Sequence, residues 1–152
     1  MTMSIPPTML LRYIGDICFS PSPESNACIN PRVRIDARQD APDDQLCQIG
    51  HMIQKGYHPD DMLPFTWNDP ETAVSITYLP NGADYDEQIT IHSEWDGKTF
   101  TYWIAKRSST EIVFSGGELI EDDATTGHVT RHDLPGFRVV LGPDGGYKAY
   151  PI

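Results

Sequence analysis

Residues 84–104 read DYDEQITIHSEWDGKTFTYWI, and this stretch predicts an antiparallel β-hairpin. Every even position from 84 to 96 is polar, whereas the odd positions include Ile89, Ile91 and Trp95. Side chains of a strand alternate between its two faces, so this pattern predicts one polar and one apolar face. Asp96-Gly97 favours a tight turn, because glycine adopts positive φ at no steric cost. We therefore predict two strands that are joined at Asp96-Gly97.

A two-residue turn at Asp96-Gly97 also predicts which side chains oppose one another, and opposed residues share a face. The predicted pairs are Trp95 with Lys98, Ser93 with Phe100, Ile91 with Tyr102 and Ile89 with Ile104 on the apolar face, and Glu94 with Thr99, His92 with Thr101 and Thr90 with Trp103 on the polar face. A slip of one residue would bury the acidic side chains and expose the isoleucines. The register should therefore be strongly specified.

Flanking segments extend this hairpin into an antiparallel β-meander over about residues 72–115. Val74, Ile76 and Tyr78 alternate with polar residues, and a further strand is predicted at 111–114, ending at Gly116-Gly117. The acidic residues 118–127 are predicted to form a loop. Two more strands are expected at about 128–132 and 137–141, followed by a C-terminal hairpin into 147–150.

The region before the meander is predicted to hold one main helix, at about residues 42–55. Pro42 suits a first helical turn, Gly56 suits the position after the last turn, and Leu46, Ile49 and Ile53 form an apolar stripe. We predict a strand- and loop-rich segment at 1–40, helix and linker at 41–70, and antiparallel sheet at 71–152. Within the first segment, the apolar run at 9–14 is expected to be a strand. The predicted fold is a single α+β domain of 152 residues.

Acidic residues dominate one third of the chain. The net charge is −11, and residues 41–96 carry eleven acidic side chains and one basic side chain, a net −10. Such a field repels phosphates and attracts basic partners, which argues against direct nucleic acid binding. Improved solubility is the alternative reason for this charge. No run of about twenty apolar residues could span a membrane, and the three cysteines match no common zinc or redox motif, so we expect a cytoplasmic protein with reduced thiols. A Cys18–Cys28 bridge in an oxidising compartment is the alternative.

Motifs for catalysis or cofactor binding are absent from the sequence. There is no nucleophile elbow, phosphate-binding loop or dinucleotide fingerprint. The acidic residues 84–87 lack the glycine and the later glutamate of a calcium loop. His92, His128 and His132 could form a metal site only if their two strands were neighbours. We therefore predict no cofactor, no metal and no catalytic residue.

Function is predicted from the charge and from the polar sheet face. An acidic face with Trp103 at its centre suits a basic protein surface, as in an immunity protein or a phage-type inhibitor of a nuclease or defence complex. The predicted binding residues are Asp84, Asp86, His92, Glu94 and Trp103. If the helix at 42–55 covers Trp103, this side chain belongs to the core instead. Two alternatives stay open: a small enzyme or ligand-binding domain with a pocket lined by Tyr78, Trp95, Phe100 and Tyr102, and a structural or chaperone subunit. The sequence leaves the oligomeric state open.

Overall fold

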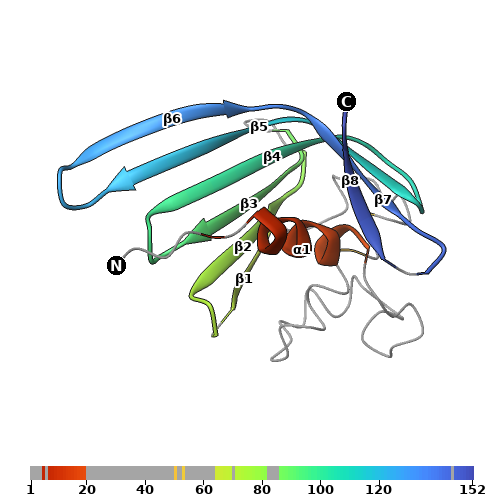
Figure 1. Cartoon of the computed structure of the whole chain (residues 1–152), viewed down its shortest axis with the longest axis horizontal. Coiled ribbons are helices and arrows are strands. Elements are labelled where there is room, and N and C mark those ends of the chain that lie inside the picture. Colours follow the sequence, from red (N-terminus) through yellow and green to blue (C-terminus); the bar gives the residue numbers. More distant parts are fainter. Residues whose placement is uncertain are drawn as a thin grey trace.

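A computed structural model describes residues 5, 7–19, 50, 53, 64–69, 71–81, 86–144 and 146–152. In these residues one antiparallel sheet curves around helix α1 (Figure 1). The elements are α1 (Pro7–Cys18), β1 (Phe65–Asp69), β2 (Val74–Leu79), β3 (Gln88–Ser93), β4 (Lys98–Arg107), β5 (Glu111–Asp123), β6 (His128–Leu134), β7 (Phe137–Leu141) and β8 (Tyr147–Pro151). No helix of the described part is long and apolar enough to cross a lipid bilayer.

The sheet has the strand order β1-β2-β3-β4-β5-β7-β8, with β6 attached to β5. The first five strands therefore follow one another as neighbours, which confirms the predicted meander. The long strand β5 has two partners on the same edge: residues 111–114 pair with β7, and residues 117–123 pair with β6. The β5–β6 hairpin consequently extends away from the part of the sheet that contains β7 and β8 (Figure 1).

The central hairpin forms as predicted, but its register differs by two residues. Ile91 opposes Phe100, not Tyr102, and the turn comprises residues 94–97. Two hydrogen bonds hold this longer turn: Glu94 N donates to the Ala73 carbonyl at 3.2 Å, and Lys98 N donates to Asp96 Oδ1 at 3.2 Å. A shift of two residues returns each side chain to its original face. The predicted pairs were therefore wrong, and the predicted strand faces of β3 and β4 were right.

The N-terminal apolar run forms helix α1, so the predicted strand at 9–14 was wrong. Pro7 occupies the first helical position. The backbone N–H that proline lacks would have no partner within the helix at this position. Tyr13, Ile14, Ile17 and Cys18 form a buried stripe at helical spacing. A short apolar run looks the same in a strand and in a buried helix, which explains the error.

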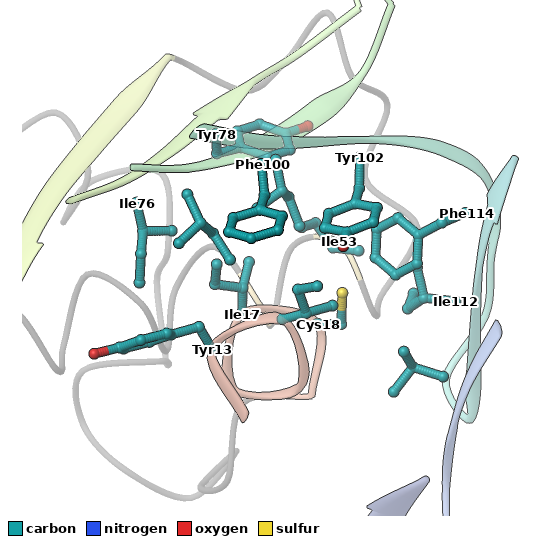
Figure 2. Close-up of a cluster of buried hydrophobic side chains, with 14 of the residues drawn as sticks. Tyr13, Ile17, Cys18, Ile53, Ile76, Tyr78, Phe100, Tyr102, Ile112 and Phe114 are labelled. Carbon is teal, nitrogen blue, oxygen red and sulfur yellow. The ribbon is translucent and has the colours of Figure 1, made fainter. Parts of the chain in front are cut away.

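Helix α1 packs on the apolar face of the sheet and closes the core (Figure 2). Its side chains Ile17 and Cys18 point towards Phe100, Tyr102 and Phe114 on the strands. The helix predicted at 42–55 lies outside the described residues except for Gly50 and Ile53, which are both helical and buried. Ile53 belongs to the same core cluster. The core therefore joins α1, the sheet and the segment that carries Ile53.

Strand β5 continues through Gly116-Gly117 to Asp123, so the predictions of a strand end at this pair and of a loop at 118–127 were wrong. A Cβ atom added to Gly117 would lie 2.6 Å from the Thr101 carbonyl oxygen and 2.7 Å from the Tyr102 ring. Glycine here permits close packing within the sheet and does not end the strand. The predicted strands near 128–132, 137–141 and 147–150 are confirmed as β6, β7 and β8.

Candidate functional site

The predicted binding residues that the structure describes do not all lie on strands β3 and β4. His92 and Trp103 share the polar face of the sheet, where His92 Nδ1 lies 2.8 Å from Thr99 Oγ1 and Trp103 is half-buried opposite Gln88. Glu94 lies in the turn after β3, and Asp86 is exposed before β3 begins. Asp84 lies outside the described residues. The prediction of a shared strand face was therefore wrong for Asp86 and Glu94, because β3 is shorter than the alternating sequence pattern.

Trp103 lies on the face opposite α1. Helix α1 and Ile53 both pack on the apolar face, together with Phe100 and Tyr102 from the same strand as Trp103. The indole therefore belongs to the polar face, whose central row consists of Thr66, Thr77, Thr90 and Thr101 on four adjacent strands.

The three histidines considered for a metal site lie far apart in the sheet. His92 is on β3, whereas His128 and His132 are on β6, and strands β4 and β5 lie between them. Strands are about 4.8 Å apart, so three strand spacings exceed any shared coordination sphere. Within the described ranges, no cluster of three histidine, cysteine or acidic side chains could hold a metal ion.

The fold brings together two acidic turns that are distant in sequence. Alternate turns of an antiparallel meander lie at the same end of the sheet, and Figure 1 shows the β3–β4 and β5–β6 turns at one end. A hollow of about 740 Å³ lies between them. It is lined by Glu94, Trp95, Asp96, Gly97, Lys98, Glu121, Asp122, Asp123, Ala124, Thr125 and Thr126. We refer to this site as the acidic hollow.

Close contact between the first turn and β5 builds one wall of the acidic hollow. Asp122 N donates to the Gly97 carbonyl oxygen at 3.0 Å. Gly97 has a φ of 66°, and a Cβ atom there would lie 2.3 Å from the Asp122 carbonyl oxygen. Only glycine combines this positive φ with so close an approach of two backbones. Gly97 therefore sets the distance between the turn and β5.

The second turn is held by one of the acidic side chains. Asp123 Oδ1 accepts hydrogen bonds from Thr125 N at 2.9 Å and from Thr126 N at 3.4 Å. Because these backbone donors favour the ionised carboxylate, the pKa of Asp123 lies below its ordinary value. Asp123 is thus a negatively charged part of the acidic hollow at neutral pH.

The charge of the acidic hollow is strongly negative. Five of its lining residues are acidic, and Lys98 is the one basic residue among them. Lys98 Nζ lies 3.5 Å from Glu121 Oε1. Trp95, which also lines the acidic hollow, is 41% exposed. Carboxylates and an indole face both attract cations, so this arrangement suits a guanidinium or ammonium group.

Sequence reasoning missed most of this site. The sequence pattern predicts Trp95 on the apolar strand face and residues 121–123 in a separate loop. The signal was present in the sequence: both acidic runs flank a hairpin turn, and alternate turns of a meander meet at one end. The two acidic runs meet because β5 extends to Asp123 and thus brings its turn to the same end of the sheet.

The residues proposed for a ligand pocket are mostly core residues. Tyr78, Phe100 and Tyr102 are buried beneath α1, and only Trp95 lines the acidic hollow. Tyr78 Oη donates to Glu87 Oε2 at 2.5 Å. Burial raises the pKa of Glu87, although this hydrogen bond and the neighbouring Arg107 favour its ionised form. This buried group supports the sheet and does not open into the acidic hollow.

Comparisons with known proteins found no match among protein-family models, curated proteins or solved structures.

Proposed function

We propose that this chain is a small, acidic, non-enzymatic cytoplasmic protein that binds and blocks a basic surface of another macromolecule. It would act in the manner of an immunity protein or a phage-type inhibitor of a nuclease or defence complex. The observation that carries this proposal is the acidic hollow, which is lined by five acidic residues and by the exposed Trp95.

The chemistry of the acidic hollow supports a protein partner with arginine or lysine at its surface. Aromatic anchors surrounded by polar groups contribute much of the affinity at many protein interfaces. The carboxylates around Trp95 attract a basic partner over long range and oppose the approach of nucleic acid. In the complex, the acidic hollow would thus cover arginine or lysine side chains with which the partner otherwise binds phosphates.

The proposal is tested by calorimetric titration of a panel of basic bacterial nucleases at rising sodium chloride concentration. We expect at least one nuclease to bind and lose activity, with an affinity that falls as salt screens the charges. Trp95→Ala should weaken that complex by about 2 kcal/mol or more. The double variant Glu94→Gln/Asp122→Asn should weaken it and flatten its salt dependence.

A matched double variant, Glu71→Gln/Asp86→Asn, removes the same formal charge at exposed positions outside the acidic hollow. It should leave the affinity nearly unchanged. Absence of binding across the panel, salt-insensitive binding, or equal losses in the two double variants would overturn the proposal.

A further inference from the structure

Strand β6 forms an open edge of the sheet. Within the described part of the chain it pairs only with β5, and residues 128–133 are all exposed (Figure 1). Because successive side chains point to opposite faces, exposure of all six means that neither face of the strand is covered. The backbone donors and acceptors on its outer edge are therefore accessible to another strand.

Among the described strands, the remaining edge strands β8 and β1 carry features that discourage such pairing. Strand β8 contains Lys148 and ends at Pro151, and β1 follows Pro64 and ends at Asp69. Proline supplies no backbone donor, and a charged side chain resists burial against an incoming strand. β6 contains neither proline nor lysine. Its two residues of fixed charge, Arg131 and Asp133, have opposite signs.

Arg131 and Asp133 make the β6 edge complementary to itself. They lie two residues apart, and so on the same face of the strand. In a two-fold antiparallel pair centred on His132, Arg131 of each copy opposes Asp133 of the other, and Thr130 opposes Leu134. Centring on Arg131 would instead place two arginines opposite each other, which is unfavourable. The charges therefore favour the register centred on His132.

Local charge also permits two acidic chains to approach at this edge. Arg131 Nη1 lies 3.2 Å from Glu118 Oε1, and His132 Nε2 lies 3.6 Å from Glu121 Oε2. The Arg131–Glu118 pair offsets the nearest carboxylate of β5, although the whole chain carries a net charge of −11. Repulsion between copies is thus weaker here than at the acidic hollow, where five acidic residues face one lysine.

We propose that a second copy of this chain pairs with β6, so that two β6 strands run antiparallel about His132 and the two sheets become continuous. The paired segment covers residues 130–134 and ends at Pro135, which has no backbone donor to continue the ladder. This interface is separate from the acidic hollow, and it does not depend on the proposed function.

The test is sedimentation equilibrium of the full chain over a wide concentration range. We expect the mass to rise to that of a dimer and the outer-edge amides of β6 to exchange more slowly at high concentration. Arg131→Asp and Asp133→Arg each turn two attractive pairs into repulsive ones, and each should weaken the dimer about tenfold. The double variant Arg131→Asp/Asp133→Arg exchanges the charges, recreates both pairs and should restore the dimer.

Lys148→Asp on β8 is the matched control, since it makes the same change of charge on another edge strand and should leave the dimer intact. Circular dichroism identifies any variant that fails to fold, and β6 amide exchange in the wild type tests the interface without substitution. A wild type that stays monomeric, or a double variant as weak as the single variants, would overturn the proposal.

Discussion

At the scale of single residues, the buried carboxylate of Glu87 is unfavourable in the core unless it has a partner. Glu87 Oε1 lies 3.6 Å from Arg107 Nε, and the two side chains are only 8% and 11% exposed. Tyr78 donates to the other carboxylate oxygen. Burial of an unpaired charge is far more unfavourable than burial of a compensated pair. Arg107 is therefore needed because Glu87 is present.

We predict that Arg107→Met lowers the free energy of unfolding by about 3–5 kcal/mol, because Glu87 keeps its burial and loses its cation. The double variant Glu87→Met/Arg107→Met should be more stable than Arg107→Met. Urea unfolding at neutral pH measures both. Arg138→Met is the control: Arg138 pairs with Glu111 at 3.0 Å but is exposed, so the loss should be about 1 kcal/mol or less. Similar losses for Arg107→Met and Arg138→Met would contradict this account.

At the scale of elements, the two turns of the acidic hollow differ in what their glycines do. Gly97 and Gly127 both have positive φ, 66° and 73°. A Cβ atom at Gly97 would collide with the Asp122 carbonyl oxygen, whereas one at Gly127 would meet no atom within 4 Å. At position 97 both the positive φ and the close packing favour glycine, whereas at position 127 only the positive φ does.

Gly127→Ala should consequently lower the free energy of unfolding by about 1–2 kcal/mol, the ordinary cost of a left-handed residue. Gly97→Ala should cost more and should also displace the turn from β5. Thermal unfolding compares the stabilities, and faster amide exchange at Asp122, which donates to Gly97, reports the displacement of the turn. Equal destabilisation with unchanged exchange at Asp122 would show that the close approach has no effect.

At the scale of the whole molecule, one side-chain cluster joins α1 to the edge of the sheet. Tyr13 Oη donates to Asp69 Oδ2 at 2.7 Å and lies 2.8 Å from Thr72 Oγ1. Burial opposes ionisation of Asp69, but hydrogen bonds from Thr72, Tyr13 and the backbone outweigh it, so the pKa of Asp69 is lowered. A carboxyl group with a lowered folded-state pKa stabilises the fold above its ordinary pKa of 3.8.

We predict that Tyr13→Phe lowers the free energy of unfolding by about 1.5 kcal/mol at neutral pH, through loss of a hydrogen bond to a charged group. This difference should shrink as the pH falls below 3.8 and through the lowered pKa, because Asp69 becomes protonated in both proteins. Urea unfolding at several pH values measures it. The exposed Tyr150 provides the control, since Tyr150→Phe should have little effect at any pH.

Several features of the fold could be predicted because they depend on neighbouring residues. The alternation around Ile89 and Ile91 identified a strand and its buried face, and Asp96-Gly97 located a turn. The exact register could not be predicted, because Glu94 is held in the turn by Ala73 from a different strand connection. The helical state of the run at 9–14 likewise depends on the sheet that buries Tyr13, Ile14 and Ile17.

The sequence by itself determined that this chain forms an acidic, antiparallel meander with one apolar and one polar face. It could do so because strand periodicity and turn preference are local properties. Only the tertiary structure decided which acidic side chains lie together. Glu94 and Asp122 line the same hollow because two alternate turns meet at one end of the sheet. The edge of β6 is open because β5 pairs with β7 along its first part and with β6 along its last part.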